Sequence, residues 1–208
     1  MLTIILLSLF CVSMTVFRIM KTDTFLYAFM VWNVFLAWIP FVVASIASFF
    51  FARRAKASLS FFVLLLCWLF FFPNAPYMVT DIIHFYYTKG EISLWFDLIM
   101  FFSYSILGIF LGFLSLSYIQ TLLKRWYGSI ISWTFFLVVH ILCGIGIYLG
   151  RTLRWNSWDI LTSPHHIVID SVQALQNTEA LQFITMVTGM LLCIHLVLHA
   201  LTFRHDVA

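Results

Sequence analysis

Long stretches of almost uninterrupted apolar residues run through the whole sequence, and no other feature constrains its fold as strongly. Only 9% of the 208 residues are charged, whereas about 25% are charged in a typical soluble domain. So few charges cannot cover a water-soluble globule, and lipid must therefore face most of the chain. Backbone groups in lipid have to be hydrogen-bonded internally, and the stretches lack the alternating pattern of barrel strands. The sequence therefore predicts an all-α integral membrane protein.

About six transmembrane helices are expected, because six stretches approach the roughly 20 residues that cross a bilayer. Pro40 predicts a kink in the second helix. Glycines favour close packing of the fourth helix (Gly108, Gly112) against the fifth (Gly146, Gly150). With no long linker and no internal repeat, the whole chain is expected to form a single polytopic membrane domain, residues 1–208. The six ranges are 2–17, 24–51, 57–72, 93–118, 129–150 and 180–203.

The distribution of Lys and Arg favours both termini in the cytoplasm, where basic residues concentrate. Six basic residues then lie inside and five outside, and the amino terminus adds a positive charge inside. The inner set is Arg53, Arg54, Lys56, Lys124, Arg125 and Arg204, and the outer set is Arg18, Lys21, Lys89, Arg151 and Arg154. A net charge of only +3 argues against a nucleic-acid partner. The four cysteines lie inside apolar runs and are expected to be packed thiols.

Two prolines interrupt the chain directly after the third span. Each disfavours helical conformation in the residue before it and supplies no N–H, so the third helix is expected to end near Phe72, before Pro73. Asn74 can cap a second, short interfacial helix, because Pro76 then falls in its first turn.

Three polar side chains share one face of this short helix at the spacing i, i+4, i+7, namely Tyr77, Asp81 and His84. Asp81 and His84 are candidate catalytic residues, as an acid–base or metal-binding pair, and Asp97 at the start of the fourth span is a third. In the alternative interpretation, Asp81 and His84 are only solvated, and Asp97 only complements the helix dipole.

A second polar group follows the fifth span. Arg151 and Arg154 lie one turn apart and can grip a phosphate or carboxylate, with tryptophans beside them at headgroup depth. A structural ion-pair network is the alternative. The candidate substrate-binding residues are Asn74, Tyr77, Arg151, Arg154, Trp155, Asn156, Trp158 and Asp159. Strict alternation of the spans puts both polar groups on one side of the membrane, so we expect them to converge into one pocket. Beyond them, Ser163 and Pro164 predict the start of an amphipathic surface helix that reaches about Gln176.

Three histidines lie deeper in the expected spans, His140 in the fifth and His195 and His199 in the sixth. Ionisable groups at that depth are rare and raise a functional hypothesis, here the ligation of a haem or a transition metal. A hydrogen-bonded contact between two helices is the alternative. No cofactor or metal can be assigned from these residues.

The motifs Pro73-Asn74-Ala75-Pro76-Tyr77, Thr80-Asp81, Trp95-Phe96-Asp97 and Arg154–Asp159 resemble those of a bacterial integral-membrane family, domain of unknown function 1361 (DUF1361). The resemblance covers roughly residues 60 to 200, and the first motif is its most specific part. It implies a multi-pass protein of the cell inner membrane and implies no activity.

Three classes of function remain open. The first is a membrane enzyme acting on a lipid or a lipid-linked, anionic substrate, although no established catalytic signature is present. The second is a transporter or a non-catalytic subunit of a membrane complex, for which six spans are few unless the chain forms a homo-oligomer. The third is an electron carrier that uses the deep histidines. Membrane lipids are partners in every case.

Overall fold

The computed structural model describes residues 1–87 and 92–202, so Lys89 and Arg204 of the charge distribution lie outside it. Within the described residues every regular element is a helix, which confirms the all-α prediction. The chain divides into two compact units, Met1–Tyr118 and Ile119–Ala208, and each is described by itself. The single membrane domain stays a prediction.

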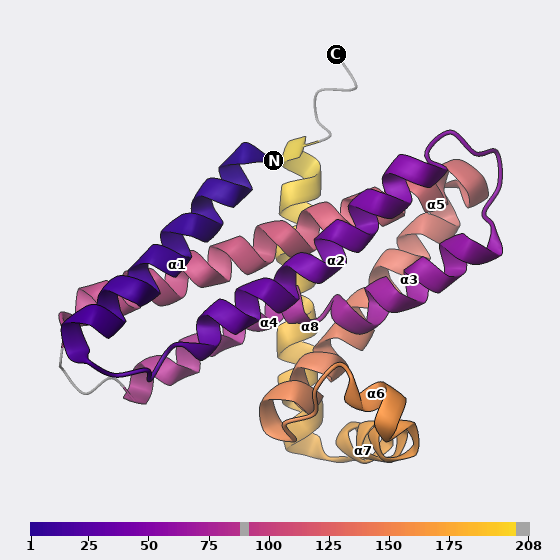
Figure 1. The fold of residues 1–208 in the computed structure, drawn as a ribbon. Coiled ribbons are helices and arrows are strands. Elements are labelled where there is room, and N and C mark those ends of the chain that lie inside the picture. The colour runs from indigo at the N-terminus through magenta and orange to yellow at the C-terminus, as the bar shows by residue number, and fades with distance from the viewer. Residues whose placement is uncertain (88–91, 203–208) are drawn as a thin grey trace. The chain divides into compact units, whose positions relative to one another are not determined.

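The first unit is built from helices that pack along their lengths. Helix α2 contacts α1, α3 and α4, and Figure 1 shows α2 and α3 joined by the turn at residues 52–58. One hydrophobic core of this unit is formed by residues of α1, α2, α4 and the first part of α5, among them Cys11, Phe41 and Tyr104. Its elements are α1 (Leu2–Thr22), α2 (Phe29–Phe51), α3 (Leu59–Phe71), α4 (Asn74–Thr80), the 3₁₀ helix η1 (Asp81–Tyr87) and the first part of α5 (Leu94–Thr152).

Helix α5 joins the two stretches that the sequence separates into a fourth and a fifth span. It is interrupted at Gly128, whose φ of 85° and ψ of 175° are not helical. Its helical conformation continues past residue 118, the expected end of the fourth span. Ile119, Leu122 and Leu123 are buried there, so the apolar stripe that supports the helix extends beyond the most apolar run.

The second unit pairs the end of α5 with α8 (Thr178–Thr202) in antiparallel orientation. A later residue of α5, Tyr148, contacts Phe183 near the start of α8, and an earlier one, Trp133, contacts His199 near its end. The short helices α6 (Asp159–Thr162) and α7 (Pro164–Gln176) connect the two, and α7 contacts both α6 and α8 (Figure 1).

Large apolar side chains are exposed on all the long helices, for example Leu9, Phe49, Ile130 and Leu201. Such surfaces are stable only against lipid. Five helical segments of the described residues are long and apolar enough to cross a membrane, with α5 counted once. The protein is therefore a multi-pass membrane protein, and the number of six crossings stays a prediction.

Glycine permits two close helix contacts, neither of which matches the expected pairing of the fourth and fifth spans. A Cβ on Gly108 would lie 2.3 Å from the Ala75 carbonyl oxygen, so α4 packs directly on α5. A Cβ on Gly144 would lie 2.2 Å from Thr188 Oγ1, so the end of α5 packs directly on α8. Helix α4, which follows the break after α3, thus packs on the surface of α5 that lacks a side chain at Gly108.

Candidate functional site

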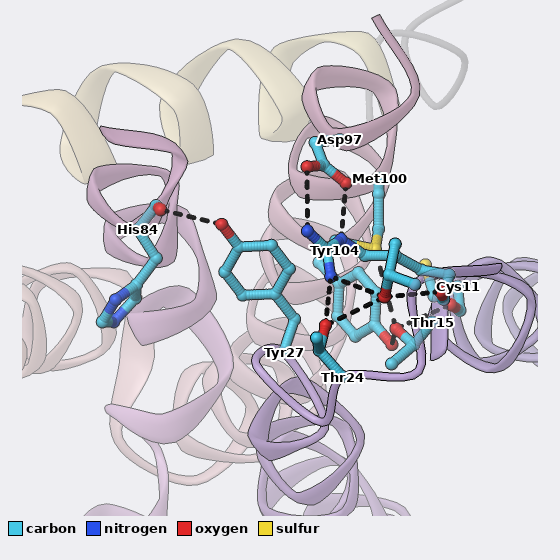
Figure 2. A network of polar contacts seen from close by, with 10 residues as sticks. Cys11, Thr15, Thr24, Tyr27, His84, Asp97, Met100 and Tyr104 are labelled. Atoms are coloured by element: carbon cyan, nitrogen blue, oxygen red, sulfur yellow. Dashed lines mark hydrogen bonds and ion pairs between the residues drawn. The ribbon is translucent and has the colours of Figure 1, made fainter. Parts of the chain in front are cut away.

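A completely buried ion pair links α1 with the first turn of α5. The Arg18 guanidinium donates from Nε to Asp97 Oδ1 at 2.8 Å and from Nη2 to Oδ2 at 3.4 Å, as the two dashed lines on Asp97 in Figure 2 show. The side chains are 1% and 0% exposed, so each charge depends on the other for compensation. The candidate catalytic Asp97 is therefore half of an internal salt bridge. Helix α1 continues to Thr22, beyond the expected end at residue 17, and carries Arg18 into this contact.

Further contacts of Arg18 hold the turn between α1 and α2. Its Nη1 donates to Thr24 Oγ1 at 3.3 Å, and its guanidinium carbon lies 4.4 Å from the centre of the Tyr27 ring. The Tyr27 hydroxyl in turn donates to the His84 carbonyl oxygen at 3.1 Å (Figure 2). One polar network therefore connects α1, the turn between α1 and α2, η1 and α5.

Asp81 is also buried, with an exposed fraction of 0%. Its Oδ2 accepts a hydrogen bond from Asn33 Nδ2 of α2 at 2.8 Å. The alternative interpretation, in which Asp81 is only solvated at the surface, is therefore wrong. The side chain is an internal polar group with a partner on another helix.

Tyr77, Asp81 and His84 do not continue on one α-helical stripe, because the chain changes from α-helix to 3₁₀ helix at Asp81. A 3₁₀ helix has about 3.0 residues per turn instead of 3.6, which rotates the following side chains. The half-buried His84 ring lies edge-on against Phe29, with centres 4.9 Å apart. Asn74 is the first residue of α4 and not its cap, since its amide donates back to the Phe71 carbonyl at 2.9 Å.

The segment after α5 is held by its own side chains. The backbone N–H and the side-chain amide of Asn156 both donate to Asp159 Oδ2, at 2.7 and 3.1 Å. The Trp155 indole N–H donates to Asp170 Oδ2 of α7 at 2.7 Å. Arg154 and Trp158 are exposed, and Arg154 has a left-handed φ of 62°. Three of the candidate binding residues thus shape this segment, while Arg154 and Trp158 face outward.

A cavity of about 190 Å³ lies beside this segment, between the end of α5, α7 and the start of α8. Two of its lining residues, Tyr148 and Ala174, also belong to a small core that contains the buried Ala180 and the ring of Phe183. The cavity wall carries one carboxylate, two amides and one phenol. The lining residues are Tyr148, Leu153, Asp170, Gln173, Ala174 and Asn177.

The deep histidines form a direct contact between α5 and α8. His140 Nδ1 is 2.7 Å from the Phe136 carbonyl oxygen, and its Nε2 is hydrogen-bonded to His195 Nδ1. Since a carbonyl only accepts, neutral His140 donates from Nδ1 and accepts at Nε2 from His195. His199 instead packs its ring against Trp133, with centres 5.0 Å apart. No group of three or more His, Cys, Asp or Glu side chains that could hold a metal gathers within residues 1–87 and 92–202.

The structure brings the candidate residues together in two separate sets. Asp97 and the His84 carbonyl belong to the network of the first unit, and Asp81 lies in the same unit with its partner Asn33. The Arg151 to Asp159 segment belongs to the second unit. Their convergence into one pocket stays a prediction. Four residues that sequence reasoning missed are central to these sites: Arg18, Asn33, Tyr148 and Asp170. For Asn33 the available signal was a strongly polar side chain inside an apolar span.

These features define a multi-pass α-helical membrane protein with a buried polar network and a small cavity near the end of two long apolar helices. The chain belongs to the family described as protein of unknown function (DUF1361), whose family model matches residues 32–194. Comparison with curated proteins and with solved structures yields no match.

Proposed function

We propose that this protein binds the polar headgroup of a membrane lipid or a lipid-linked molecule in the cavity between α5, α7 and α8. The observation that carries the proposal is the cavity itself. It combines four polar side chains with the apolar lining residues Leu153 and Ala174, and this combination fits a molecule that has a polar head and an apolar chain.

The position of the cavity along the chain supports a lipid as the ligand. Tyr148 and Leu153 flank the end of α5 at Thr152, and Asn177 directly precedes α8. The ends of long apolar helices lie at headgroup depth, where tryptophans such as Trp155 and Trp158 also concentrate.

Helix α7 supports the same location. Val168, Val172 and Leu175 form an apolar stripe and are 62%, 49% and 45% exposed. A helix with an exposed apolar stripe of this kind is stable when it lies in the membrane surface. The wall of the cavity that α7 supplies would then face the lipid headgroups.

A chemical step is not part of the proposal. Asp97 is neutralised by Arg18 and Asp81 is held by Asn33, which supports structural roles for both carboxylates. Catalysis by Asp81, His84 and Asp97 therefore stays a sequence-based prediction. The direct bond between His140 and His195 supports the interhelical contact in preference to haem ligation.

The proposal is tested by blocking the cavity and measuring the lipids that remain bound after purification in detergent. Gln173→Trp places an indole in the cavity wall, and Gln176→Trp places the same group on the same exposed helix away from the cavity. Native mass spectrometry should show bound lipid for the wild-type protein and for Gln176→Trp, and at least a several-fold loss for Gln173→Trp. Equal lipid occupancy in all three proteins would contradict the proposal.

A further inference from the structure

Asp170 is the one charged residue among the six that line the cavity, and it is negative. The other five lining residues are neutral. Arg151 and Arg154 by themselves predict an anionic ligand. The cavity wall has the opposite charge, and this difference points to the chemistry of the ligand.

The carboxylate of Asp170 is oriented and only partly satisfied. Its Oδ2 accepts the Trp155 indole N–H at 2.7 Å, which holds this oxygen in place. An ionised carboxylate offers about four lone-pair positions, so Oδ1 and part of Oδ2 can accept further hydrogen bonds. The indole is neutral and leaves the negative charge uncompensated.

No basic side chain of the described residues forms an ion pair with Asp170. Asp170 is also half-buried, in a segment that we place at the membrane surface. An unpaired charge next to hydrocarbon is costly, and proteins retain one where it meets a ligand or another charge. A cation that enters the cavity would compensate the charge of Asp170.

We propose that the cavity recognises the primary ammonium group of an aminophospholipid headgroup. This inference rests on the proposed function and adds the class of ligand. An ammonium group donates three hydrogen bonds from one small centre. Asp170, the side-chain oxygen of Gln173 and the phenol of Tyr148 offer acceptors of the required kind around the same cavity. A metal ion is a weaker candidate, because the wall supplies only one carboxylate for a hard cation that prefers several.

A volume of about 190 Å³ also limits the ligand. Sites for whole drug-sized molecules measure about 300–1,000 Å³. The cavity therefore accommodates a headgroup while the acyl chains stay in the bilayer. The phosphate of the same lipid would lie outside the cavity, where the exposed Arg154 directly precedes Trp155 in the chain.

The test compares lipids that differ in the amine. Native mass spectrometry of the detergent-purified protein measures the occupancy of phosphatidylethanolamine, phosphatidylglycerol and phosphatidylcholine added at equal concentration. We expect the wild-type protein to prefer phosphatidylethanolamine by about tenfold, as for a hydrogen bond to a charged group. Equal binding of phosphatidylethanolamine and phosphatidylglycerol would overturn the inference. If the wild-type protein binds the two lipids equally and Gln173→Trp lowers the binding of both, the lipid cavity stands and only the ammonium is wrong.

The charge of Asp170 is tested with Asp170→Asn, which keeps an oxygen acceptor for Trp155. The preference for phosphatidylethanolamine should disappear while phosphatidylglycerol binding is unchanged. Glu179→Gln removes the same charge from the exposed first turn of α8, outside the cavity lining, and should leave the preference intact. A preference that persists in Asp170→Asn would overturn the inference.

A soluble amine is the other source of the same group. Glycerophosphoethanolamine carries the headgroup without acyl chains, and we expect at least a hundredfold weaker competition from it than from the lipid. Competition at the same concentration as the lipid would overturn the lipid as the source and assign a soluble amine.

Discussion

At the scale of single residues, Arg18 and Asp97 compensate each other's charge inside the first unit. Arg18 and Asp97 are 79 positions apart in the sequence and form a two-point contact without exposure to solvent. The contact also takes Arg18 out of the set of basic residues that report orientation. A buried pair of this kind contributes little net stability, but the loss of one partner leaves an uncompensated charge.

We therefore expect Asp97→Asn to destabilise the protein by about 3–5 kcal/mol, because Arg18 would keep its charge without a counterion. Removal of both charges in Arg18→Met/Asp97→Leu should restore much of the loss. Thermal unfolding in detergent measures both effects, with Lys21→Gln on the exposed side of α1 as the control. A wild-type melting temperature for Asp97→Asn would contradict the structural role of the pair.

The bond between His140 and His195 makes a second prediction at this scale. Double-mutant cycles of hydrogen bonds between membrane helices average about 0.6 kcal/mol and reach about 1.7 kcal/mol. Because both imidazoles are buried, a cycle of His140→Phe and His195→Phe should give a coupling in the upper part of that range. The matched cycle of His140→Phe and His199→Phe should give none, and equal couplings in the two cycles would refute the assignment.

At the scale of elements, α4 packs closely against α5 because residue 108 is a glycine. The Ala75 carbonyl oxygen of α4 occupies the place where residue 108 would carry a Cβ. Backbone cannot move aside as a flexible side chain can, so α4 and α5 must separate if this place is filled.

Gly108→Ala is thus expected to destabilise the protein by roughly 1–3 kcal/mol, the usual cost of overpacking. Gly189→Ala is the matched control, because a Cβ there meets nothing within 4 Å. Alanine is the better helix former, so the control should be neutral or stabilised by up to about 1 kcal/mol. Melting temperatures of the two variants should move in opposite directions, and equal losses would contradict the close contact with α4.

At the scale of the whole molecule, the central question is how often the chain crosses the membrane. Helix α5 has 59 residues, and a straight helix of that length would measure about 90 Å against a hydrocarbon core of about 30 Å. The non-helical Gly128 divides it into two pieces that are each long enough to cross. Without the buried Arg18, four of the five outer basic residues remain against six inner ones, which strengthens the preference for cytoplasmic termini.

Reporter fusions test this topology directly. With six crossings, fusions after Lys56 and Arg125 should report the cytoplasm, and fusions after Lys89 and Thr162 should report the opposite side. If the fusions after Arg125 and Thr162 report the same side, α5 does not cross between them and the six-span prediction is wrong.

The sequence by itself determined the class of protein and most helix positions. A chain with so few charges has a stable surface only against lipid. In lipid, a helix satisfies all backbone hydrogen bonds of an apolar run within the run itself. The prolines after Phe72 likewise predicted by local stereochemistry that α3 ends near Phe72, and it ends at Phe71. Both arguments need only neighbouring residues.

Only the tertiary structure decided which polar residues meet. In the sequence, Arg18 has the position of a charge that flanks a span, and only the rotation of α1 shows that it contacts Asp97. Asp170 is one polar residue of a surface helix in the sequence, and only the folded structure places it beside Tyr148 and Asn177. These spans are apolar on nearly all sides, so their hydrophobic pattern does not specify the rotation of each helix about its axis. Long-range contacts such as Gly108 against Ala75 select it, because the close approach of two backbones has few alternative registers.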